Sequence, residues 1–70
     1  MKIKYIYSKE PEKERIIDTE KSYKSFAFAI TDPYSKLYNK TQSEFDEIQL
    51  RILKDGKQKG EFLSFEIVQF

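Results

Sequence analysis

Three residue types are missing from this chain of 70 residues, which has no cysteine, no histidine and no tryptophan. Without cysteine there is no disulfide and no thiol nucleophile, and without cysteine or histidine the usual zinc ligands are gone. Histidine is also the side chain that titrates near neutral pH without help from its surroundings. We therefore expect no catalytic residue, no metal and no cofactor, and a protein that is not an enzyme.

A charge of one sign and a long apolar run are also lacking. The 13 basic and 12 acidic residues give a formal net charge of +1, and the signs are mixed along the chain. This balance argues against the basic stripe of a duplex-DNA binder and against an acidic DNA mimic. The longest apolar run, residues 26–30, is far shorter than the ~20 residues that span a bilayer. With no secretory signal visible, we expect a cytoplasmic protein with no membrane partner.

Aromatic residues, by contrast, are abundant. Six phenylalanines and five tyrosines stand in this short chain, and each can remove about 150–250 Å² from water. A chain of this length forms one thin core, so we expect a single domain over residues 1–70.

The N-terminal segment has the pattern of a β-hairpin. In residues 2–7 the apolar Ile3, Tyr5 and Tyr7 fall on one face and Lys2, Lys4 and Ile6 on the other, which is typical of a half-buried strand. Pro11 lies in a polar turn, and residues 15–18 can return as a short second strand.

From Asp18 the hydrophobic period changes. Asp18 or Thr19 can cap a helix, and Pro33 ends it. The apolar residues then recur with helical spacing, at Tyr23, Phe26, Ala27 and Ile30. A strand is the alternative, because Phe26, Phe28 and Ile30 also alternate with two alanines. We favour a helix, since alanine is the best helix former and is depleted in strands.

The C-terminal third alternates twice around a glycine-containing segment. Ile48, Leu50 and Ile52 alternate with polar residues, and so do Leu63, Phe65 and Ile67 further on. Residues 55–60 hold both glycines of the chain, which favours a tight turn and a second β-hairpin. In the loop 31–43 between helix and hairpin, Thr41 and Glu44 match a capping box and predict one helical turn over 42–46.

Together these segments predict an α+β fold in ββαββ order. About four strands form a small antiparallel sheet, and one helix packs on one of its faces. The reverse face is then partly apolar, which marks an interface or a dimer contact. The predicted partner surface consists of Ile6, Leu53, Phe62, Val68 and Phe70. Coverage of this face by the 31–43 loop is the alternative.

Carboxylates do not form a convincing site. Glu10, Glu12 and Glu14 are interleaved with basic residues and read as a solvated hairpin tip. Glu66 lies between two apolar residues, but alternation places it on the solvent face, where it protects an apolar strand from aggregation.

The leading hypothesis is a small non-enzymatic module that binds a protein partner or itself through the partly apolar sheet face and the 31–43 loop. The alternative is weak binding of single-stranded nucleic acid, in which bases stack on aromatic rings and lysines follow the phosphates. The side chains for this alternative are Tyr34, Lys36, Tyr38 and Lys40.

Overall fold

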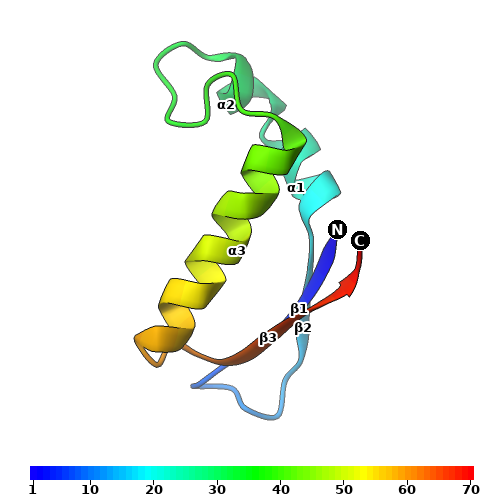
Figure 1. The fold of residues 1–70 in the computed structure, drawn as a ribbon, viewed down its shortest axis with the longest axis vertical. Helices are drawn as coiled ribbons and strands as arrows, with labels where there is room; N and C mark the ends of the chain where they lie inside the picture. Colours follow the sequence, from blue (N-terminus) through cyan, green and yellow to red (C-terminus); the bar gives the residue numbers. More distant parts are fainter.

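The computed structural model describes residues 1–70 and has one three-stranded antiparallel sheet with one long helix on one side of it and two short helices beyond its end (Figure 1). The strands are β1 (Lys2–Tyr7), β2 (Arg15–Asp18) and β3 (Phe62–Gln69), in the order β2-β1-β3. The helices are α1 (Thr19–Ser25), α2 (Ala27–Thr31) and α3 (Gln42–Gln58). The α+β class and the N-terminal hairpin are confirmed, whereas the four strands and the ββαββ order are not.

The largest difference concerns residues 42–58, which form one long helix instead of a helical turn and a strand. Thr41 caps this helix, since its hydroxyl oxygen accepts the Glu44 N–H at 3.2 Å. Glutamine, glutamate, leucine, arginine and lysine dominate the segment, and all are strong helix formers. The buried residues Phe45, Leu53 and Gly56 share a helical face. The alternation of Ile48, Leu50 and Ile52 was therefore a misleading signal.

The two glycines serve the end of α3 and not a β-turn. Gly60 has φ +82°, and its N–H donates to the Lys57 carbonyl at 3.1 Å, while the Glu61 N–H donates to the Gly56 carbonyl at 2.8 Å. This pair of bonds is a Schellman cap with glycine in the left-handed position. Gly56 instead lies against the ring of Phe62, which leaves no room for a Cβ atom.

The sheet core joins α3 to the strands. Ile3, Leu53 and Phe62 are its buried residues, and the half-buried side chains packed around them include Tyr5 and Leu50. Six of the 70 residues are buried in all, so the core is thin.

The predicted helix after Asp18 is confirmed but is broken in two at Phe26. The Asp18 carboxylate accepts the N–H groups of Glu20 and Lys21 at 3.1 and 3.2 Å, and these bonds lower the pKa of Asp18. The chain turns at Phe26, so α2 and residues 32–40 lie beyond the end of α3, away from the sheet (Figure 1). The molecule is elongated as a result, with extents of 38 × 24 × 16 Å.

Candidate interaction surfaces

The predicted partner surface is divided by the structure. Leu53 and Phe62 lie in the core, so the expectation that they face away from the helix is wrong. Leu53 belongs to α3, where strand alternation does not apply. Phe62 is turned inward by a register shift, because Tyr7 pairs with Phe62 while Ile6 pairs with Ser64. One extra residue in a strand moves its side chains to the other face.

The remaining residues of that surface stay accessible but are not adjacent in the way the sequence suggested. Val68 is half exposed and Phe70 is 96% exposed, at the C-terminal end of β3. Ile6 is half-buried on the reverse face of the sheet, beside Lys4 and Ser64.

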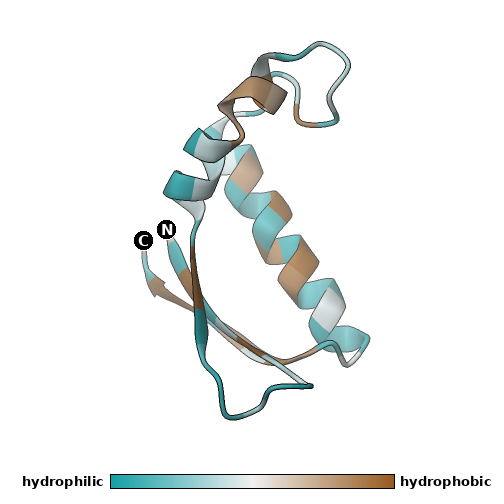
Figure 2. Cartoon of the chain, turned by 180° about the vertical axis from the view of Figure 1, so that it is seen from behind, coloured by the Kyte–Doolittle hydropathy of each residue, from teal (hydrophilic) through white to brown (hydrophobic).

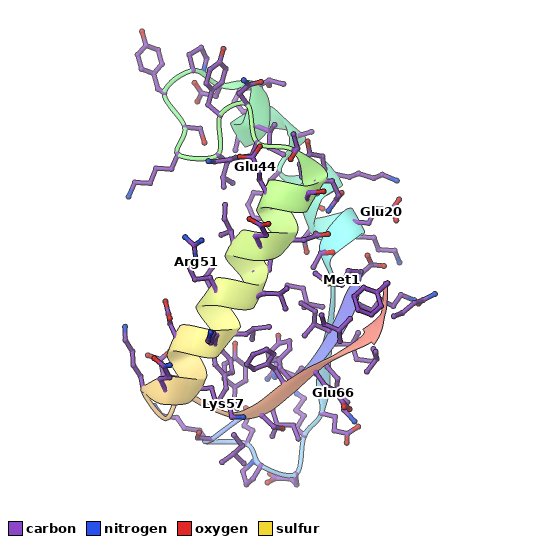
Figure 3. All side chains as sticks on the ribbon, in the orientation of Figure 1. Met1, Glu20, Glu44, Arg51, Lys57 and Glu66 are labelled. Atoms are coloured by element: carbon purple, nitrogen blue, oxygen red, sulfur yellow. The ribbon has the colours of Figure 1, made fainter.

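The reverse face of the sheet carries both charged and apolar side chains. Lys4 Nζ lies 2.9 Å from a Glu66 carboxylate oxygen and 3.7 Å from one of Glu14, and the hydrogen bond with Glu66 raises the pKa of Lys4. Figure 3 shows Glu66 on the side of the sheet away from α3. Ile16, the register partner of Lys4, is the most exposed apolar side chain of this face at 63%.

A different apolar surface lies at the far end of the molecule, on α1, α2 and the segment 32–40. Figure 2 shows α2 as a continuous hydrophobic stretch at this end. Four of its aromatic side chains are exposed. We call them the aromatic end: Phe26, Phe28, Tyr34 and Tyr38. Phe28 is 84% exposed and Tyr34 is 97% exposed, which is unusual for side chains of this size.

Phe45 anchors the aromatic end to α3. Its side chain is 1% exposed and lies 5.6 Å from the Tyr23 ring and 6.1 Å from the Phe26 ring, measured between centroids. The Tyr23 hydroxyl donates to the Lys40 carbonyl at 2.8 Å, which fixes the end of the loop. The inner side of the end is thus packed, while the outer side is open.

The loop itself is a series of hydrogen-bonded turns. The Asp32 carboxylate accepts the Tyr34 N–H at 3.0 Å, and the Tyr38 N–H donates to the Ser35 carbonyl at 3.1 Å. Asn39 has φ +60°, and its N–H closes the loop by donating to the Ile30 carbonyl at 2.8 Å. These bonds hold the loop on its own end of the molecule, so it does not cover the sheet.

The residues predicted to bind single-stranded nucleic acid lie on this same loop, but one of their two lysines is already in an ion pair. Tyr34, Lys36 and Tyr38 are exposed. Lys40 is half-buried, and its Nζ lies 3.6 Å from Glu44. Within the four predicted residues, one lysine therefore remains without an ion pair.

A polar hollow lies at the opposite end, where the β1–β2 loop meets the turn after α3. Arg15 is one of the residues that line it, with a guanidinium nitrogen 2.7 Å from a Glu10 oxygen and its Cζ 5.1 Å from the Tyr7 ring centroid. The bond from Arg15 lowers the pKa of the Glu10 carboxyl. The pairing of one guanidinium nitrogen with Glu10 ties the loop to the sheet, while the Nε atom of Arg15 is buried without a hydrogen-bond partner.

The chain holds no group of three or more acidic, histidine or cysteine side chains placed to bind a metal ion. None of its helices has the length and the apolar character needed to cross a bilayer. Comparisons with protein-family models, with curated proteins and with solved structures gave no match for this chain. The candidate sites therefore rest on the chain's own geometry.

Proposed function

We propose that this protein is a contact module that binds a partner protein through its aromatic end. The observation that carries the proposal is the exposure of Phe28 and Tyr34 on a segment that is otherwise held in place by hydrogen bonds. Large apolar side chains that are ordered and uncovered are typical of interfaces. A rigid aromatic anchor also loses little conformational freedom on binding.

The chemistry of the end favours an apolar partner surface. Two lysines at this end are paired with a glutamate four residues away in the sequence: Lys24 with Glu20 at 3.0 Å and Lys40 with Glu44 at 3.6 Å. With these two charges paired within the chain, the exposed rings and the unpaired loop lysine, Lys36, are left for recognition. The partner that fits is a protein with an apolar pocket or groove that accepts Phe28 as its central residue.

Site-specific photo-crosslinking tests this proposal. A benzophenone side chain replaces Phe28 in one variant, Tyr34 in a second and Ile16 in a third. Ile16 is the matched control, because it is also apolar and exposed but lies on the sheet. We expect the same protein adduct from positions 28 and 34 and none of it from position 16.

Binding of that protein, once purified, is then measured by calorimetry. Phe28→Ser removes the anchor and should weaken the affinity by about tenfold or more, with the circular dichroism spectrum unchanged. Equal adducts from all three positions, or an affinity unchanged by Phe28→Ser, would refute the proposal.

Single-stranded nucleic acid remains the second candidate, favoured by one observation. Tyr34 and Tyr38 present exposed rings on either side of the unpaired Lys36, and exposed rings are platforms on which bases stack. The test is fluorescence anisotropy with a labelled oligonucleotide at rising salt. Binding that falls steeply with salt and is lost in Tyr34→Ala supports this candidate, and absence of binding at low salt excludes it.

A further inference from the structure

Strand β3 forms an open edge of the sheet. It has eight residues and pairs with β1 on one side only. The Thr19 N–H donates to the Met1 carbonyl at 2.8 Å, so residue 1 and residue 19 form a hydrogen-bonded pair. Bonded and non-bonded pairs alternate in an antiparallel ladder, so the backbone groups of the odd-numbered residues of β1 face β2 and those of the even-numbered residues face β3. The β3 partners of Lys4 and Ile6 are Glu66 and Ser64. The backbone N–H and C=O groups of Phe65 and Ile67 therefore point outward, toward no strand.

The other edge of the sheet lacks this character. Strand β2 has four residues, begins at Arg15 and ends at Asp18, whose side chain caps α1. Short length and charged residues are the usual protection of an edge strand. From Phe62 to Phe70, by contrast, Glu66 is the sole charged residue, and it is paired with Lys4 on the reverse face. The open edge is thus long and almost uncharged.

The chain also exposes more surface than a compact monomer of its size. Its accessible surface is 5369 Å², whereas a compact monomer of 8.4 kDa exposes about 4,600 Å². The radius of gyration is 13.1 Å, against about 11 Å for a compact 70-residue domain. This excess follows from the elongated shape, because α2 and residues 32–40 lie beyond the end of α3.

From these observations we infer that two copies of this chain pair antiparallel along the β3 edge and form one continuous six-stranded sheet. The proposal concerns a surface other than the aromatic end and does not depend on the partner proposed there. Two features of the edge favour a second copy over another kind of chain, and each follows from two-fold symmetry.

The first feature is the position of the symmetry axis. Phe65, near the middle of β3, lines a groove together with Leu50, the middle residue of α3. Antiparallel pairing centred on Phe65 places Phe65 opposite its own copy and Glu66 opposite Ser64. Centring the pair one residue later would place the two Glu66 carboxylates opposite each other, which is unfavourable. Charge therefore disfavours the register centred on Glu66, and the register centred on Phe65 keeps the two carboxylates apart.

The second feature is the charge along α3. Its first half carries Glu44, Asp46 and Glu47 with no basic residue, and its second half carries four basic residues and one acidic one through Lys59. Figure 3 shows Glu44 and Lys57 at opposite ends of the helix. A two-fold axis through the β3 edge makes the two α3 helices antiparallel, so the acidic half of one faces the basic half of the other.

Sedimentation equilibrium and hydrogen exchange together test this inference. The natural chain should sediment as a dimer of twice 8.4 kDa at high concentration and dissociate on dilution. The amides of Phe65 and Ile67 should exchange slowly in the dimer and rapidly in the monomer. The amides of Ser64 and Glu66 are internal controls, since they are bonded to β1 in both states.

The variant for this test is Leu63→Lys with Val68→Lys, which places lysines at two half-exposed positions of the edge. We expect the dimer dissociation constant to rise by about a hundredfold, since lysine on an edge opposes strand pairing. Ile16→Lys makes the same apolar-to-lysine change on the opposite edge and should leave the dimer intact.

Three outcomes overturn the inference. They are a monomer at every concentration up to about 1 mM, fast exchange of Phe65 and Ile67 in a dimer, and a dimer that is lost in Phe28→Ser but kept in the double-lysine variant. The last outcome would move self-association to the aromatic end, so it separates this inference from the proposed function.

Discussion

The two ends of this molecule use aromatic side chains in opposite ways. At the sheet end, Phe62 closes the core over Ile3 and Leu53, and Tyr5 and Tyr7 pack their rings against it at 5.8 and 5.0 Å. At the helical end, Phe45 is buried, but Phe26, whose ring packs against it, is half exposed, and Phe28 is almost fully exposed. The sheet end buries Phe62 for stability and leaves Phe70 exposed at the end of β3, whereas the helical end exposes several neighbouring rings at the cost of a larger apolar surface.

The substitution Phe62→Ala should have the largest effect, because it opens the core that joins α3 to the strands. Removing a buried phenylalanine costs about 3–5 kcal/mol, and a domain of this size has only about 4–10 kcal/mol of stability in total. Urea unfolding should show a chain close to its stability limit. Val68→Ala is the control and should change stability by about 0.5 kcal/mol or less. A stable Phe62→Ala protein would show that this residue faces outward, as strict alternation predicted.

The substitution Phe45→Ala tests whether the helical end is a separate unit. The expected loss is about 3 kcal/mol, at the lower limit for such a change, because the half-exposed Phe26 can move into the space. Hydrogen exchange should rise in α1, α2 and residues 32–40, while amides of β1 and β3 remain protected. Equal loss of protection in the sheet would mean that the two ends unfold together.

The elements that could be predicted correctly are those whose pattern depends only on residues close together in the sequence. The strand over 2–7, the return over 15–18 and the cap at Asp18 each depend on neighbouring residues, and all three are confirmed. The long helix was missed because three alternating residues, Ile48, Leu50 and Ile52, were weighed above a run of helix formers that follows a capping box. The segment with Gly56 and Gly60 then resembled a hairpin turn. In the structure, Gly56 lets the Phe62 ring pack closely against α3, and Gly60 caps the end of that helix.

The inward turn of Phe62 could not be predicted from the chain alone. It depends on an extra residue in β3 between the partners of Ile6 and Tyr7, and a bulge is defined only by both strands. The exposure of Phe28 was equally hidden, because its own segment fits a buried helix. What leaves it uncovered is the break at Phe26, which carries α2 beyond the end of α3.

The substitution Gly56→Ala should destabilise the sheet end although it favours a helix. Alanine in place of glycine normally stabilises a helix by about 1 kcal/mol. Here the added methyl group would overlap the Phe62 ring, and overpacking of this kind costs about 1–3 kcal/mol. Thermal unfolding of Gly56→Ala, alone and combined with Phe62→Leu, measures the conflict. If the overlap is the cause, the smaller side chain at 62 should relieve part of it, and additive losses would contradict this explanation.

The smallest effect is expected at Asp18, where the two ends meet. Asp18 is the last residue of β2 and the N-cap of α1, and bonds from the Lys21 and Glu20 N–H groups lower its pKa below the ordinary value of 3.8. A carboxyl whose folded pKa is lowered stabilises the fold above its unfolded pKa, and this contribution is lost as the pH falls through the folded value.

Asp18→Asn keeps an acceptor for the cap but cannot titrate. The difference in unfolding free energy between the natural chain and Asp18→Asn is measured by urea unfolding from neutral pH to about pH 3, and it should shrink on acidification. In the natural chain, hydrogen exchange on acidification should show protection lost first in the helical end. A difference that is independent of pH would show that the carboxylate charge has no part in joining the helical end to the sheet.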